Sequence, residues 1–87
     1  MAIQEREEVM YIQDIVLAAT LKYFGCEYIW VELKSISKEI YEFKFIRNPE
    51  LDSLVDKYLK QELLIEPNIF IWIYKTFKNT LYLQMRR

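Results

Sequence analysis

Few positions in this chain allow its backbone to turn sharply. The 87 residues include one glycine, Gly25, and two prolines, Pro49 and Pro67. Glycine adopts the left-handed conformation that ends many helices, whereas proline suits the first turn of a helix and breaks its interior. We therefore expect a helix to end near Gly25, another to begin at Pro49, and an element to end before Pro67.

The segment between Met10 and Phe24 has the apolar spacing of a helix. Its main stripe consists of Ile12, Ile15, Val16, Ala19 and Tyr23, and it is widened by Leu17, Leu21 and Phe24. A spacing of three and four residues places such side chains on one helical face. Gly25 follows at the position of a left-handed C-terminal cap. The pattern predicts a first helix over residues 10–24.

Two later segments have the composition of β-strands. Tyr28–Leu33 and Ile40–Ile46 are rich in β-branched and aromatic residues, and both alternate in character along the chain. With a polar loop over residues 34–39 between them, they predict a two-stranded antiparallel hairpin. The predicted core face carries Ile29, Val31, Leu33, Tyr41, Phe43 and Phe45. Trp30 is then expected on the wetter face, beside Glu42 and Lys44.

The sequence Asn48-Pro49-Glu50 is typical of a helix start. Asparagine accepts hydrogen bonds from unpaired backbone amides, proline suits the first helical position, and an acidic side chain favours the positive end of the helix dipole. The apolar residues that follow at helical spacing are Leu51, Leu54, Val55, Tyr58 and Leu59. A second helix is therefore expected here, and Pro67 is expected to end whatever precedes it.

The residues after Asn68 fit two structures. Ile69–Tyr74 is a continuous apolar run that could form a buried strand. A helical stripe is formed by Phe70, Ile73, Tyr74, Phe77, Leu81 and Tyr82. The length of this pattern favours a third helix. The whole chain is then predicted to be a flexible polar lead over residues 1–8 and a single α+β domain over residues 9–87, with the order helix, hairpin, helix, helix and the hairpin packed on the helices.

The composition removes the usual centres of catalysis and metal binding. The chain has no histidine, which is the commonest proton shuttle and metal ligand, and too little glycine for a phosphate-binding loop. Its one cysteine, Cys26, is interpreted as a small buried hydrophobe, with a reactive thiol as the alternative. We therefore expect no enzymatic activity, cofactor, metal site or small-molecule substrate.

Charge is close to balanced over the chain but unevenly placed. The formal net charge of −1 excludes a globally basic nucleic-acid-binding protein. No uncharged run approaches the roughly 20 apolar residues that span a bilayer, and the acidic start differs from a signal peptide, so a cytoplasmic protein without membrane contact is expected. Eight basic and thirteen acidic residues precede Pro67, whereas four basic residues and no acid lie from Pro67 onward.

The basic C-terminal segment is a candidate binding site. As a helix it would gather Lys75, Lys78, Asn79, Tyr82 and Arg86 on the side away from the apolar stripe. Such side chains neutralise phosphates, hydrogen-bond bases and stack on them, although so few charges permit only weak, salt-sensitive binding. The alternative is that these cations only complement the dipole at the end of a helix.

Three aromatic residues are candidates for an interface. Tyr28 and Trp30 lie on the first predicted strand, where they could stack on RNA bases, pack in the core or form a dimer seam. Trp72 lies in a run that is apolar nearly all round, so it either occupies the core or meets a partner. Tryptophan and tyrosine commonly anchor protein interfaces.

Several segments carry a family resemblance. They are Asp14–Leu21 followed by Gly25, Tyr41–Phe45, Pro49–Leu51 continuing to Lys57 and Tyr58, and Pro67 with Lys75–Tyr82. Over about residues 11–82 the chain resembles a family of small proteins of tailed phages and mobile elements that is catalogued only as a domain of unknown function. The resemblance implies a compact mixed domain of phage or mobile-element origin, and it implies no activity.

These observations favour a protein that works by binding. The leading hypothesis is a small non-enzymatic phage or mobile-element accessory protein, acting in the host cytoplasm, that binds another protein or itself as a homodimer through Trp30 or Trp72. One alternative is a weak nucleic-acid-binding accessory factor that uses the basic terminal helix. Another is an inhibitor of a host defence complex, whose acidic first two-thirds would mimic nucleic acid.

Overall fold

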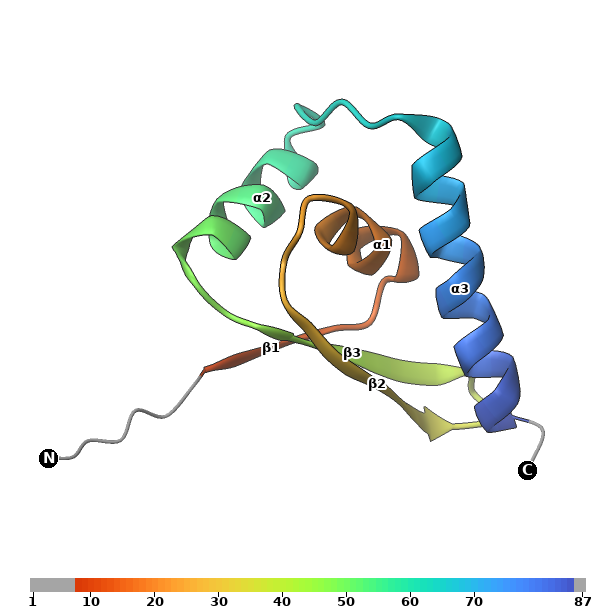
Figure 1. Ribbon diagram of the computed structural model, residues 1–87. Coiled ribbons are helices and arrows are strands. Elements are labelled where there is room, and N and C mark those ends of the chain that lie inside the picture. Colours follow the sequence, from red (N-terminus) through yellow and green to blue (C-terminus); the bar gives the residue numbers. More distant parts are fainter. Residues whose placement is uncertain (1–7, 86–87) are drawn as a thin grey trace, which may run out of the picture.

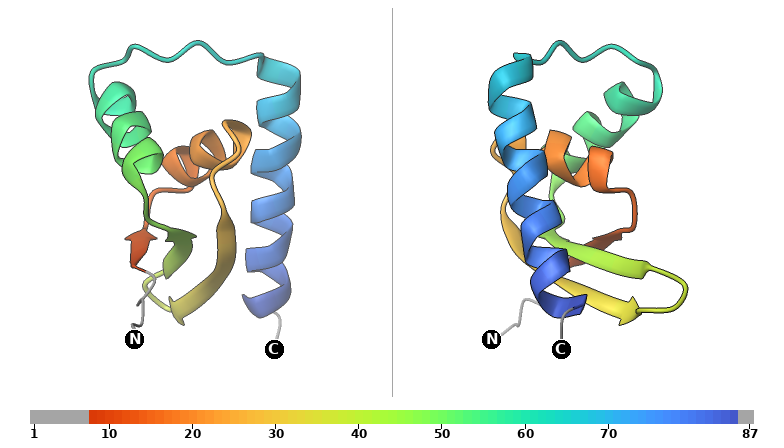
Figure 2. Two further views of the ribbon diagram at one scale, coloured as in Figure 1. Left: turned by 60° about the vertical axis from the view of Figure 1, so that its left-hand side comes forward. Right: turned by 90° about the vertical axis from the view of Figure 1, so that its right-hand side faces the viewer.

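The computed structural model describes residues 8–85. Its elements are β1 (Val9–Ile12), α1 (Ile15–Tyr23), β2 (Tyr28–Ser35), β3 (Ile40–Ile46), α2 (Pro49–Leu59) and α3 (Pro67–Met85). The strands form an antiparallel sheet in the order β1-β3-β2, α1 and α2 lie over one face of this sheet, and α3 runs beside β2 (Figures 1 and 2). The α+β class is thus confirmed, but the sheet has three strands where the sequence predicted two.

The third strand comes from the start of the predicted first helix. Val9–Ile12 pairs with β3, with Met10 opposite Phe45 and Ile12 opposite Phe43. The helix cannot include these residues because Asp14 caps it: one of its carboxylate oxygens accepts a hydrogen bond from the backbone N–H of Val16 at 2.9 Å. The prediction that the helix begins at residue 10 was therefore wrong, because α1 begins only after Asp14.

The other end of α1 forms as the sequence predicted. Gly25 has a φ of +89°, and its N–H donates to the carbonyl of Lys22 while the N–H of Cys26 donates to the carbonyl of Leu21. These two bonds form a Schellman motif, which satisfies carbonyls that would otherwise lack partners at the end of the helix. Glycine is favoured here because it adopts a positive φ without steric strain.

A bulge in β2 changes which residue of this strand faces the core. Tyr28 lies opposite Phe45 and Trp30 opposite Lys44, so Ile29 is the extra residue between two pairs. Tyr28 therefore turns inward, with its ring centroid 5.0 Å from that of Phe77, and Ile29 is 45% exposed. The prediction that Ile29 faces the core was wrong, whereas the placement of Trp30 on the wetter face is confirmed.

The core lies between the sheet and the helices. Phe43 is fully buried in β3, and its ring centroid is 4.8 Å from that of Phe77 in α3 and 5.5 Å from that of Tyr41. The other apolar residues buried in this cluster are Ile12, Ile15, Ala18, Ala19, Leu21, Val31, Phe45, Leu51, Ile73 and Leu81. Ala18 and Ala19 are wholly buried, in keeping with the close packing of α1 on other elements.

Both later helices begin at a proline. The side-chain oxygen of Asn48 accepts a hydrogen bond from the N–H of Leu51 at 2.8 Å, which confirms the predicted start of α2. The predicted third helix is confirmed as α3. Pro67 does not terminate a helix, however, because α2 already ends at Leu59 and Pro67 is the first residue of α3, where its missing N–H has no cost.

Most of the predicted polar lead, residues 1–7, lies outside the described residues. The last residue of that lead, Glu8, accepts a hydrogen bond at its carbonyl from the N–H of Arg47 at 2.9 Å, which continues the pairing of β1 with β3. Within residues 8–85, none of the helices combines the length and the apolar character that crossing a membrane requires.

Candidate functional site

Trp30 lies on a groove along the edge of the sheet. This edge groove runs between β2 and the C-terminal part of α3 and has a volume of about 1110 Å³. It is lined by Trp30, Glu32, Leu33, Lys34, Ile36, Ser37, Thr80, Leu83 and Gln84. Three of its apolar side chains are more than half exposed, namely Trp30 at 51%, Ile36 at 55% and Leu83 at 66%. Large apolar side chains gathered at one place on a surface are typical of an interaction site.

The side-chain amide of Gln84 forms two hydrogen bonds with the backbone of β2 at this groove. Its oxygen accepts a hydrogen bond from the N–H of Leu33, and its nitrogen donates to the carbonyl of Val31, both at 2.9 Å. A neighbouring strand would use the same kind of backbone groups, since an edge strand presents unpaired N–H and C=O groups. Gln84 thus closes this part of the edge of β2 with a side chain.

We expect Gln84→Ala to lower the free energy of unfolding by about 1–3 kcal/mol, because it leaves a partly buried N–H and C=O without partners. The variant should also self-associate more than the parent, because part of the strand edge becomes open. Urea unfolding and size-exclusion chromatography measure the two effects. Gln13→Ala is the control, since Gln13 makes only a long 3.4 Å bond on the surface; equal behaviour of both variants would show that Gln84 does not protect the edge.

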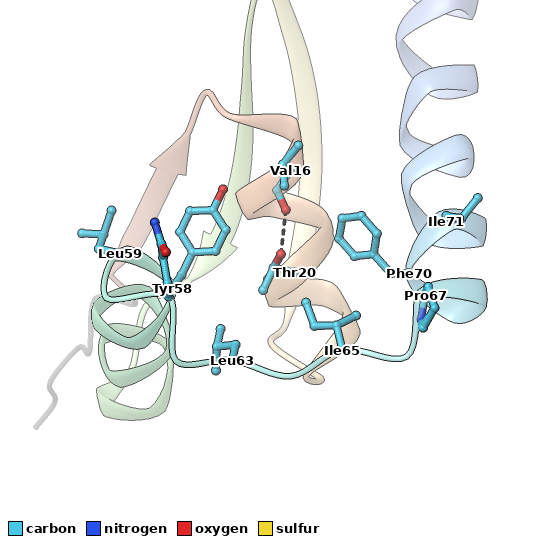
Figure 3. A pocket seen from close by; sticks show the side chains of 10 residues that line it. Val16, Thr20, Tyr58, Leu59, Leu63, Ile65, Pro67, Phe70 and Ile71 are labelled. Carbon is cyan, nitrogen blue, oxygen red and sulfur yellow. Dashed lines mark hydrogen bonds between the residues drawn. The ribbon is translucent and has the colours of Figure 1, made fainter.

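A second hollow opens between the three helices. Figure 3 shows its floor on α1 at Val16 and Thr20, with Tyr58 of α2 and Phe70 of α3 facing it from either side and the loop residues Leu63 and Ile65 at its end. Leu59 and Ile71 line its rim, and their side chains point outward from α2 and α3. This interhelical pocket has a volume of about 800 Å³ and is also lined by Gln61 and Pro67. None of its lining residues is charged. The hydroxyl of Thr20 donates to the carbonyl of Val16 at 2.8 Å, so it is satisfied within α1.

The basic residues predicted on the last helix are only partly presented to solvent. Lys75, Asn79 and Tyr82 are exposed on α3. Lys78 is half-buried, with its Nζ 5.9 Å from the ring centroid of Tyr74 and 5.7 Å from that of Tyr82. Cation–π contacts of this kind hold a lysine against rings of its own helix. Two of the predicted contact residues are therefore already packed against each other.

Tyr28 and Trp72, the other predicted site residues within the described part of the chain, do not come together. Arg86 lies outside the described residues. Tyr28 packs into the core, and Trp72, although 69% exposed, lines neither the edge groove nor the interhelical pocket. Of the three candidate interface residues, Trp30 is the one that lines a groove.

Burial raises the pKa of several tyrosine side chains and of the cysteine. Burial, and then the negative charge of Asp14, raises the pKa of Tyr58, whose hydroxyl donates to Asp14. Burial raises the pKa of Tyr41, and the positive charge of Lys78 opposes that rise. Burial and the charge of Glu50 raise the pKa of the half-buried Cys26, which packs against the core. Residues 8–85 contain no group of three or more side chains that could hold a metal ion.

Sequence reasoning missed both hollows. Each is assembled from segments far apart in the chain: Trp30 and Leu83 both line the edge groove, and Val16 and Ile71 both line the interhelical pocket. No local pattern marks Gln84 as a partner of β2. For the interhelical pocket, the sequence offers a signal in the apolar run Leu63-Leu64-Ile65, which lies between the end of α2 and Pro67.

Comparison with known proteins bears on the family. No curated protein and no solved structure matches the chain. The model of the family described as a domain of unknown function, DUF5659, matches residues 7–83, which is nearly the whole sequence. The chain therefore belongs to the DUF5659 family.

Proposed function

We propose that this protein is a small non-enzymatic domain that binds another protein, or a second copy of itself, through the edge groove. The observation that carries the proposal is the exposure of Trp30, Ile36 and Leu83 along one groove. Burying exposed apolar surface favours association, and tryptophan is enriched among the residues that dominate binding energy. We further propose an accessory role of phage or mobile-element origin in the host cytoplasm, which is what the resemblance noted in the sequence implies.

The experiment compares Trp30→Glu with Trp72→Glu. Both tryptophans are at least half exposed, so neither change should unfold the domain, but only Trp30 lines the edge groove. Tagged parent and variants are used to capture proteins from host lysate, and light scattering across a concentration series measures self-association. We expect Trp30→Glu to weaken the partner or dimer at least tenfold, equivalent to about 1.4 kcal/mol, and Trp72→Glu to leave it unchanged.

Three results would contradict the proposal. The first is a partner or dimer that tolerates Trp30→Glu, and the second is equal loss in both variants. The third is a monomer at high micromolar concentration that captures no protein but binds a single-stranded oligonucleotide, since this would favour the nucleic-acid alternative.

A further inference from the structure

The interhelical pocket has the form of a slot between helices. α2 and α3 both pack on α1 but lie on opposite sides of it, and residues 60–66 join them at one end (Figures 1 and 2). α1 therefore forms a floor between two helical walls (Figure 3). Helices pack side by side at separations of about 8–10 Å, and an apolar groove of this kind is how many domains bind a helix of a partner.

The surface of the slot is apolar and partly open to water. Val16 on the floor is 41% exposed, and the two rim residues, Leu59 on α2 and Ile71 on α3, are 70% and 45% exposed. Leu64, in the loop that closes the end, is 92% exposed. An amphipathic helix carries apolar side chains at spacings of three and four residues, so it would cover such a floor and both walls at once.

Two lysines of α3 place positive charge beside the slot. Lys75 and Lys78 follow Ile71 by four and seven residues, so they continue the same face of α3. Neither lysine forms an ion pair with a described carboxylate, and α3 has no acidic residue between Pro67 and Met85. Three carboxylates near the slot are engaged within the fold: Asp14 caps α1, Asp56 pairs with Lys60, and Glu66 accepts a hydrogen bond from the N–H of Ile69 at 2.8 Å. Glu62, in the loop that joins α2 to α3, lies on the side of the slot away from Lys75 and Lys78 along the chain.

We propose that the interhelical pocket binds an amphipathic helix of a partner protein, with its apolar face in the slot and aspartate or glutamate on the flank beside Lys75 and Lys78. Opposite charges along this wall select the partner and its orientation, while apolar burial supplies most of the affinity. This site is separate from the edge groove, and no lining residue is shared between them.

The probe is a displayed library of helical peptides of about 18 residues, randomised at the apolar and flanking positions. Binders selected on the parent are sequenced and then titrated against variants. We expect enrichment of acidic residues on one flank, at least tenfold weaker binding to Ile71→Glu, and a preference for basic flanks when Lys75→Glu and Lys78→Glu are combined. Circular dichroism checks that each variant remains folded.

The matched control is Ile69→Glu. Ile69 is 54% exposed on the same helix but does not line the pocket, so this variant should bind the selected helices as the parent does. Trp30→Glu should also retain them, which separates this site from the edge groove. Failure to enrich any helix, enrichment of basic or uncharged flanks, retention by Ile71→Glu, or loss in Ile69→Glu would each overturn the proposal.

Discussion

Replacing Phe43 with alanine is expected to lower the free energy of unfolding by about 3–5 kcal/mol. Phe43 is fully buried, and its ring lies among those of Tyr28 and Tyr41 from the sheet and Phe77 from α3. Removing the ring deletes apolar contacts and leaves a cavity that rigid neighbours cannot fill. Single domains are stable by only about 5–15 kcal/mol, so the variant should be marginal.

Urea unfolding followed by circular dichroism measures this effect, with Trp72→Ala as the control. Trp72 has the larger side chain but is 69% exposed, so its removal should change stability by no more than about 0.5 kcal/mol. If Phe43→Ala lowers the free energy of unfolding no more than Trp72→Ala does, the packing of Phe43 against Phe77 does not hold the sheet to α3.

Leu51→Ala should cost about 2–5 kcal/mol, and the effect should be largest in α2. Leu51 is the one residue of α2 that is buried, while Leu54, Val55 and Tyr58 are half-buried. Without this anchor, α2 should open separately, because regions with few buried apolar contacts unfold locally at low free energy. Binding at the interhelical pocket should weaken too, since α2 forms one of its walls.

Amide hydrogen exchange distinguishes local from global opening. Amides of α2 should lose protection before those of β3 in Leu51→Ala, and Leu59→Ala should change neither, because Leu59 is 70% exposed. Equal loss of protection in all elements would contradict local opening, because it would show that α2 unfolds together with the rest of the core.

Much of the fold follows from signals carried by a few adjacent residues. The glycine cap at Gly25 and the Asn48-Pro49 helix start were predicted correctly because each depends on hydrogen bonds within one turn. The length of the apolar pattern after Asn68 was also sufficient to identify α3. The inward positions Val31, Phe43 and Phe45 followed from the alternation of side chains along a strand.

The errors arose where pairing between distant segments decides the outcome. Val9–Ile12 is too short to show a strand period, and it becomes β1 only because β3 offers it a partner. Alternation also fails at a bulge, where one extra residue turns Tyr28 inward and Ile29 outward. Neither feature is visible in local composition.

The amino-acid order alone determined where α2 begins, where α1 ends and which residues make up most of the core, because capping and hydrophobic periodicity act over a few neighbouring positions. Tertiary structure decided the third strand, the edge closed by Gln84 and the two hollows. Each of these requires residues about 30 to 55 positions apart to come together, which depends on how whole elements pack.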